Sequence, residues 1–179
     1  ETRIKEAFTD IEIERLRVAA ETAKEAAVIE TLLSTGCRVS ELCMLHSNNL
    51  DRDKQRLSIV GKGNKERYVY LNARAQVALV AYWYDANIQE GYLFQGRRKG
   101  SQMTASGIQK LLKRVAGRAG VENVHPHRFR RTAATMALRR GMSLEVIMQF
   151  LGHSQMDTTL GYARISKDEL EHQHRQFLN

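Results

Sequence analysis

Apolar side chains recur every three or four positions along most of the chain, which is the spacing of amphipathic helices. Thr9 with Glu12 forms a capping box and predicts a helix that runs to about residue 20. The stretch AKEAAVIETLLSTG predicts a second helix, ended by Gly36, and RVSELCML predicts a short third one. Further helical patterns, the last opened by a second capping box, lie at about 73–88, 104–118, 126–140, 143–151 and 166–178.

The period of the pattern changes in the middle of the first half of the chain. RLSIV and ERYVYL alternate apolar and polar positions and are rich in β-branched and aromatic residues, so they predict two strands. GKGNK between them predicts a hairpin turn with Lys62 at its tip. We therefore expect an α+β fold that is mainly α-helical with a small antiparallel β-sheet.

Length and apolar content favour one domain over two small ones. The chain has 179 residues, of which 42% are hydrophobic, and this is enough for one sizeable core. The longest apolar runs, AAVIETLL and AQVALVAYW, are too short to span a bilayer, and no signal peptide precedes the first helix. Cys37 and Cys43 fit neither a disulfide framework nor a C-x-x-C pair, which predicts buried thiols. We expect a soluble, cytoplasmic protein.

Charge narrows the choice of partner. The formal net charge is +8 and the pI about 9.7, values that favour a polyanion but are shared by ribosomal, membrane-surface and simply basic proteins. The stretch from Arg97 to Arg140 contains twelve Lys or Arg residues and a single acidic residue, Glu122. A solvated helix face would alternate its signs, and this stretch does not. A nucleic-acid phosphate backbone is the simplest neutraliser.

The motif HPHRFRRT carries much of that charge. Pro126 suits the first turn of a helix, and on a helix His127 shares a face with Arg130 or Arg131. Spacing does not choose between the two arginines. Phe129 belongs to the apolar stripe that would bury this helix. Alone, the motif fits a capping histidine beside a surface arginine better than it fits a phosphate site.

Three other motifs supply partners in a fixed order. TGCRVSEL places Arg38 after a helix-ending glycine with Glu41 three residues on, GKGNKER offers Lys62, and LGHSQMDTTLGY offers His153 and Tyr162. With HPHRFRRT, these motifs make the chain resemble the tyrosine recombinase (lambda integrase-like) family over almost its whole length. It looks most like the Xer-type and the transposon or phage integrase members. The resemblance implies the catalytic domain fold of that family.

The resemblance also assigns roles and selects Arg130 over Arg131. It implies two phosphate-binding arginines, a lysine acid, a supporting histidine pair and a tyrosine nucleophile, which are Arg38 and Arg130, Lys62, His127 and His153, and Tyr162. Two arginines suit the charge on a pentacovalent phosphorus, because each guanidinium can form bidentate hydrogen bonds. A phenol with a pKa of about 10 needs a base or a strong positive potential before it attacks, and the histidine of HPHRFRRT is the candidate base. A lysine of lowered pKa can protonate the leaving 5′ oxygen.

The implied reaction is site-specific cleavage and rejoining of double-stranded DNA through a 3′-phosphotyrosyl bond, with strand exchange through a Holliday junction. Glu41 is either a plain helix-face carboxylate or a residue that orients Arg38. Further DNA contacts are predicted at Lys65, Arg67, Arg97, Arg98, Lys99, Arg128 and Arg131. Lys65 is also a rival to Lys62 for the acid role.

Other residues have plainer interpretations. Five tyrosines look like core or strand residues, namely Tyr68, Tyr70, Tyr82, Tyr84 and Tyr92. His125 with His127, and His172 with His174, lack further ligands at metal-site spacing, so we predict no metal site and no cofactor. Phe129 and Arg131 differ from the commoner leucine and histidine of the family, outside the implied catalytic set.

The ends of the chain carry expectations about assembly. We expect residues 1–179 to form a single catalytic domain without the family's N-terminal DNA-clamping domain, with residues 1–8 as the remnant of a linker. Residues 164–179 resemble the family's C-terminal helix, which docks on a neighbouring protomer, so a homo-oligomer on DNA, tetrameric in the synapse, is expected. A type IB topoisomerase and a non-catalytic DNA-binding module are the alternatives; the first would lack the tail helix, and the second would need only the basic stretch.

Overall fold

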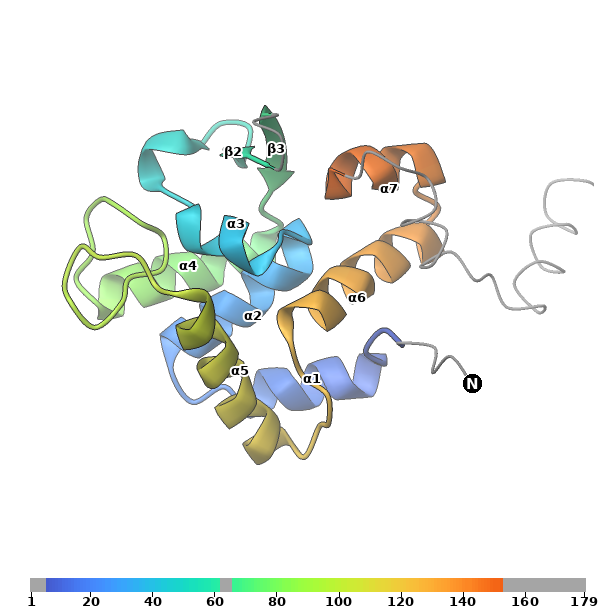
Figure 1. Ribbon diagram of the computed structural model, residues 1–179, viewed down its shortest axis with the longest axis horizontal. Coiled ribbons are helices and arrows are strands. Elements are labelled where there is room, and N and C mark those ends of the chain that lie inside the picture. The colour runs from blue at the N-terminus through green and yellow to red at the C-terminus, as the bar shows by residue number, and fades with distance from the viewer. Residues whose placement is uncertain (1–5, 62–65, 153–179) are drawn as a thin grey trace, which may run out of the picture.

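The structure, a computed structural model, describes residues 6–61 and 66–152 (Figure 1). The helices are α1 Asp10–Val18, α2 Ala23–Thr35, α3 Val39–Met44, α4 Ala73–Asp85, α5 Ala105–Ala119, α6 Pro126–Arg139 and α7 Leu144–Leu151. The strands are β1 Leu50–Asp51, β2 Arg56–Val60 and β3 Glu66–Tyr70, and a 3₁₀ helix spans Ser47–Asn49. The predicted fold class is confirmed, and every helix predicted within the described residues is present with small shifts at its ends.

Local signals explain where the helices begin and end. The Thr9 hydroxyl accepts from the backbone N–H of Glu12 at 3.2 Å, and the Glu12 carboxylate accepts from the backbone N–H of Thr9 at 2.8 Å, so the predicted capping box forms. At the other end of the next helix, Gly36 has φ 56° and donates its N–H to the Leu32 carbonyl. Such caps satisfy backbone groups that a helix leaves unpaired at its ends.

The sheet contains one strand more than the sequence predicted. Strand β2 pairs antiparallel with β3 from Arg56↔Tyr70 to Val60↔Glu66, as expected for a hairpin. The two-residue strand β1 also pairs antiparallel with β2, which gives a three-stranded sheet in the order β1-β2-β3. Two residues are too few to show an alternating pattern, so β1 had no signal in the sequence. Residues 62–65 of the hairpin connection lie outside the described residues.

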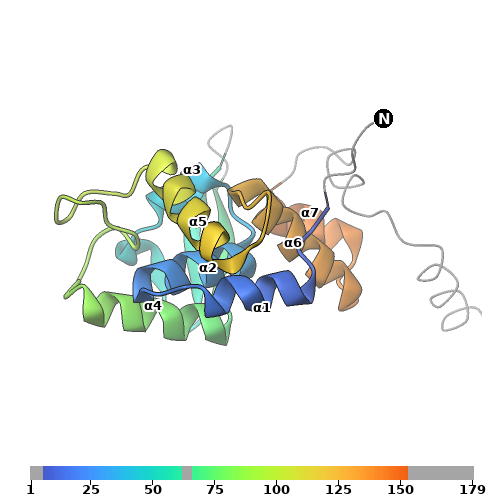
Figure 2. The same cartoon turned by 90° about the horizontal axis from the view of Figure 1, so that it is seen from below.

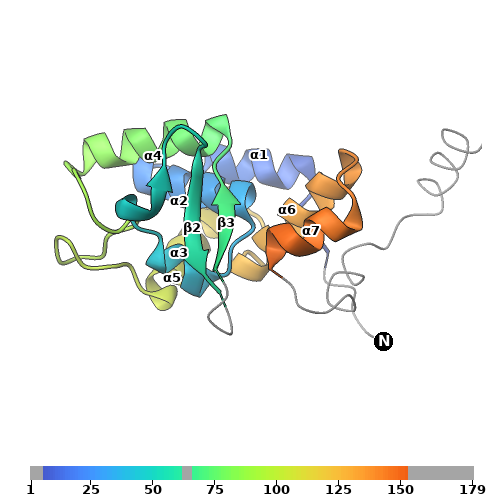
Figure 3. The ribbon, with the colours of Figure 1, turned by 90° about the horizontal axis from the view of Figure 1, so that it is seen from above.

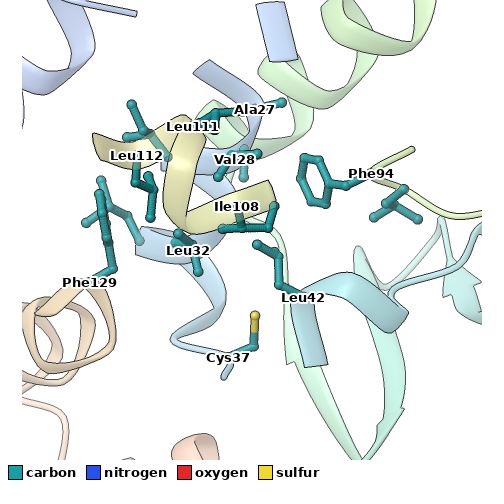
Figure 4. Packing of buried hydrophobic residues seen from close by; sticks show 14 of the residues in the cluster. Ala27, Val28, Leu32, Cys37, Leu42, Phe94, Ile108, Leu111, Leu112 and Phe129 are labelled. Carbon is teal, nitrogen blue, oxygen red and sulfur yellow. The ribbon is translucent and has the colours of Figure 1, made fainter. Parts of the chain in front are cut away.

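Helix α2 is the centre of the molecule and is buried along most of its length. Side chains from four elements meet in the core beside it, among them Leu32 of α2, Leu42 of α3, Ile108 of α5 and Phe129 of α6 (Figure 4). Helices α1 and α4 lie on one side of the molecule, and α3, α5, the C-terminal end of β2 and the N-terminal end of β3 lie on the opposite side (Figures 2 and 3). The core therefore holds α3 and the hairpin on one common face.

Several single-residue predictions can be compared with the structure. Cys37 and Cys43 are free and buried as predicted, and burial raises the pKa of the Cys37 thiol to about 11. The prediction for Tyr84 was wrong, because this side chain is 89% exposed on α4. Helices that face a core on one side leave aromatic positions free on the other, and composition alone does not distinguish the two. None of the described helices has the length and apolar character that a bilayer crossing requires.

Candidate active site

Arg38 lies at the junction between α2 and α3. Arg38 is the N-cap residue of α3 and lies two positions after Gly36, which ends α2. A Cβ atom at Gly36 would lie 3.0 Å from Leu151 Cδ2 and 3.1 Å from Phe150 Cε1, so the end of α7 packs directly on this glycine. The left-handed backbone and the close approach together require glycine in the TGCR motif.

The Glu41 carboxylate organises the start of α3. Its side chain is 5% exposed, and its Oε2 accepts from the backbone N–H of Arg38 at 2.7 Å while Oε1 accepts from Arg38 Nη1 at 3.1 Å. Oε2 also accepts from Arg67 Nη2 at 2.8 Å. One buried carboxylate thus contacts two arginines, which satisfies a charge that would be costly to leave unpaired.

Arg130 joins α6 to the ends of two other helices. Its residue is 2% exposed, and its guanidinium donates from Nη1 to the Gly36 carbonyl at 2.7 Å and from Nη2 to the Leu151 carbonyl at 2.6 Å. Phe129, fully buried beside it, holds this turn of α6 against the core. His127 is exposed one helical turn earlier. The structure therefore brings Arg130 to the loop that carries Arg38.

The electrostatics of this junction are dominated by cations. Arg38 and Arg67 both pair with the buried Glu41 carboxylate, and the charges of Arg67 and Arg130 both act on the buried thiol of Cys37. Burial lowers the pKa of Arg67, Arg38 lowers it further, and Glu41 opposes the change. An arginine remains protonated at neutral pH in spite of such a shift. A site with this excess of positive charge favours an anion such as a phosphodiester.

Four predicted site residues, Lys62, Lys65, His153 and Tyr162, lie outside the described residues, so their roles stay predictions. The described part of the chain ends directly before His153, because α7 ends at Leu151 and Gly152 caps it. Among the described residues, no three His, Cys, Asp or Glu side chains come together in a way that could hold a metal ion.

The predicted DNA contacts divide into exposed and enclosed residues. Arg97, Arg98 and Lys99 are exposed in the loop before α5, and Arg131 is half-buried on α6. Arg67 is largely buried in the contacts described above. The sequence reasoning missed exposed cations on α5, although they belong to its basic stretch; Arg97 lines a surface hollow with Lys110, Lys113 and Arg114.

Arg128 faces away from the site and binds the N-terminal part of the chain. Its Nη2 donates to both carboxylate oxygens of Glu12 at 2.9 Å, and its Nη1 donates to the Glu122 carbonyl at 2.7 Å. Its Cζ lies 4.1 Å from the centre of the Phe8 ring. These contacts tie the N-terminal turn of α6 to Phe8 and α1, and the predicted DNA contact of Arg128 stays a prediction.

The fold and this arginine site define a mainly α-helical domain with a site that favours an anion such as a phosphodiester. Comparison with known families agrees with this description. The Phage integrase family model matches residues 6–169, and the chain belongs to this family. It is similar to tyrosine recombinase XerC of Bacillus pumilus, with 35% identity over 157 residues that cover 82% of this chain and 51% of the relative. The corresponding XerC of Corynebacterium glutamicum is 36% identical over 154 residues, covering 84% of this chain and 49% of the relative.

The chain thus spans about half the length of the curated relatives it matches. A crystal structure of XerA recombinase superimposes with a TM-score of 0.85 at 28% identity, covering 98% of this chain and 65% of that one. XerH site-specific recombinase bound to a palindromic difH substrate, in a post-cleavage complex, gives 0.79 at 23% identity, covering 99% and 54%. The second likeness concerns the fold. The family and the catalytic domain fold implied by the motifs are confirmed.

Proposed function

We propose that this chain carries the catalytic centre of a site-specific DNA recombinase that cuts and rejoins double-stranded DNA through a 3′-phosphotyrosyl intermediate. One observation carries the proposal: Arg130 of α6 donates hydrogen bonds to the Gly36 carbonyl, two positions before Arg38, and to the Leu151 carbonyl at the end of α7. From that helix end the chain continues to His153 and Tyr162. The similar sequences are named tyrosine recombinase XerC, and a structural neighbour, the XerH site-specific recombinase, is described bound to a palindromic difH substrate.

The proposed reaction is a transesterification. The Tyr162 oxygen attacks the phosphorus, its proton passes to His127, and a bond forms between tyrosine and the 3′ phosphate. The phosphorus–O5′ bond breaks, and Lys62 donates a proton to the departing 5′ oxygen. Arg38 and Arg130 stabilise the charge on the phosphoryl oxygens. The phosphodiester energy is kept in the new bond, so a 5′ hydroxyl of a second strand can reverse the step.

The DNA would lie on the face that carries α3, α5 and the end of the β2–β3 hairpin (Figures 2 and 3). Exposed cations of α5 and of the loop before it supply phosphate contacts on this face, and such contacts make affinity depend on salt. A homo-oligomer assembled on DNA through residues 164–179 and action in the bacterial cytoplasm remain predictions that go with this function.

A suicide-substrate assay tests the proposal. Nicked half-sites, drawn from a library because the recognition sequence is unknown, are incubated with wild-type protein, with Tyr162→Phe and with the control Tyr84→Phe. The control alters an exposed tyrosine on α4, on the side opposite the proposed DNA face. We expect a covalent protein–DNA adduct on a denaturing gel from the wild type and the control and none from Tyr162→Phe.

An adduct that persists in Tyr162→Phe would refute the assignment of the nucleophile. Salt-dependent DNA binding without any adduct from the wild type would favour the alternative of a DNA-binding module. Once an adduct and its site are known, relaxation of a supercoiled plasmid is compared with recombination between two copies of that site. Relaxation without recombination would favour the topoisomerase alternative.

A further inference from the structure

We propose that Arg67 is a positioning residue of the active site and not a DNA contact. It fixes the position of Arg38 relative to the C-terminal end of α7. The inference rests on the proposed function, because it concerns the alignment of the phosphate-binding arginine. It rests on what the Arg67 guanidinium touches, on how deeply it is buried, and on how closely the backbone approaches it.

The first observation is the carboxylate that Arg67 shares with Arg38. Glu41 Oε2 accepts from Arg67 Nη2 at 2.8 Å, and the same carboxylate accepts from the backbone and the side chain of Arg38. The orientation of Arg38 therefore depends on a group whose own position is fixed by Arg67. Without Arg67, this 5%-exposed carboxylate would keep only its bonds to Arg38 among those the structure describes, and could turn about them.

The second observation is the end of α7. Arg67 Nη1 donates to the Phe150 carbonyl at 3.1 Å, beside the bond from Arg130 to the Leu151 carbonyl. Two guanidinium groups thus bind successive carbonyls at the C-terminus of one helix, where cations are favoured by the helix dipole. Arg67 therefore links the Arg38 carboxylate to the helix end that precedes His153 in sequence.

The third observation is the fit between Arg67 and Gly152. A Cβ atom at residue 152 would lie 2.5 Å from Arg67 Nε and 2.7 Å from Arg67 Cδ, so this part of the Arg67 side chain approaches the Gly152 backbone too closely for any residue but glycine. The side chain is 12% exposed, and its Nε is buried with no hydrogen-bond partner among the described residues. This degree of enclosure explains why the glycine of the LGH motif is required and leaves little of Arg67 for a DNA phosphate.

A lysine at this position would keep the charge but lose the geometry. The guanidinium spans two acceptors on different elements with two separate nitrogens, whereas an ammonium offers a single nitrogen on a flexible stem. In Arg67→Lys, we expect the simultaneous hydrogen bonds to Glu41 and to the Phe150 carbonyl at the end of α7 to be lost. The chemical step should slow about 10- to 100-fold, as when other supporting residues around a reactive group are altered. Affinity for DNA should change less than 3-fold, a rough bound that reflects the burial of the side chain.

The test is single-turnover cleavage of the site found with the half-site library, by wild-type protein, Arg67→Lys and the control Arg56→Lys. Arg56 is a matched arginine on the neighbouring strand β2, also largely buried and also with a buried Nε, but its ion pair is with Asp51 within the sheet. Each protein is given the normal phosphodiester and the same site with a neutral methylphosphonate at the cleaved position. A neutral group needs less stabilisation from Arg38, so a fault in Arg38 alignment should matter less there.

We expect Arg67→Lys to cleave the phosphodiester slowly, to bind DNA normally, and to recover to within about 5-fold of the wild type on the methylphosphonate. Arg56→Lys should match the wild type on both. Equal losses on the two substrates would indicate a general structural defect and overturn the inference. Weakened DNA binding with a smaller salt slope would return Arg67 to the DNA contacts. Cleavage by wild type and Arg67→Lys at the same rate would also overturn it, whereas failure of the wild type itself would refute the proposed function on which it rests.

Discussion

Arg128 offers the sharpest contrast between the charge pattern of the sequence and the packing of the structure. The basic stretch predicted that Arg128 binds DNA, whereas the structure places its guanidinium against Glu12, Phe8 and three backbone carbonyls, which are those of Glu6, Ala7 and Glu122. Replacing it with alanine removes all these contacts together. We therefore expect Arg128→Ala to lower the free energy of unfolding and to leave DNA binding nearly unchanged.

The size of the loss follows from the contacts. In the ion pair with Glu12, one Arg128 nitrogen donates to both carboxylate oxygens, and the two side chains, 12% and 24% exposed, are partly shielded from water. A hydrogen bond to a charged group contributes about 1.5–3 kcal/mol, and a cation over an aromatic ring adds about 0.5–1 kcal/mol. Such terms are not additive, so we expect a loss of about 2–4 kcal/mol in total. For a chain of this length, each kcal/mol lowers the melting temperature by about 2–4 °C, which gives about 5–15 °C.

The assay pairs thermal or urea unfolding with DNA binding at several salt concentrations. Arg139→Ala is the control, because Arg139 ends the same helix, is exposed, and loses the same charge. The control should unfold within about 0.5 kcal/mol of the wild type. Unchanged stability of Arg128→Ala together with a DNA affinity that falls and a salt slope that decreases by about one would refute our reasoning and support the original prediction.

Three further predictions address pH, backbone geometry and the DNA face. Burial raises the pKa of Glu12, but hydrogen bonds from Thr9 and Arg128 outweigh it and leave that pKa below its ordinary value of 4.5. The stability that Glu12 adds is therefore present above pH 4.5 and lost as the pH falls further. In urea unfolding, the difference in unfolding free energy between wild type and Glu12→Gln should narrow below that pH. Gly152→Ala should slow DNA cleavage, because its Cβ meets Arg67. Gly117→Ala, in open space within α5, should leave cleavage unchanged and stabilise the fold by about 0.5–1 kcal/mol in the unfolding measurements. Equal rates of DNA cleavage by the two variants would contradict the packing of Gly152 against Arg67. Lys113→Gln on α5 should reduce the slope of log affinity against log salt by about one, and an unchanged slope would remove α5 from the DNA face.

Much of the secondary structure was predictable because its signals are local. The capping box of Thr9 and the helix-ending Gly36 act through neighbours three or four residues away, so the sequence contains both partners of each contact. The strand pair was predictable from its alternation, but β1 was not, because two residues carry no period. Tyr84 was misjudged for a related reason: the residue type does not reveal which side of α4 faces water.

The sequence by itself determined the helical class, the excess of positive charge and the ordered motifs that identify the family and name Arg38 and Arg130 as partners. Only the tertiary structure decided which groups Arg67, Arg128 and Arg130 contact. Arg128 meets Glu12 across 116 positions, and Arg67 meets the Phe150 carbonyl across 83. A guanidinium binds whichever carboxylate, carbonyl or phosphate the fold brings within about 3 Å, so its role depends on contacts between elements and not on its neighbours in the chain.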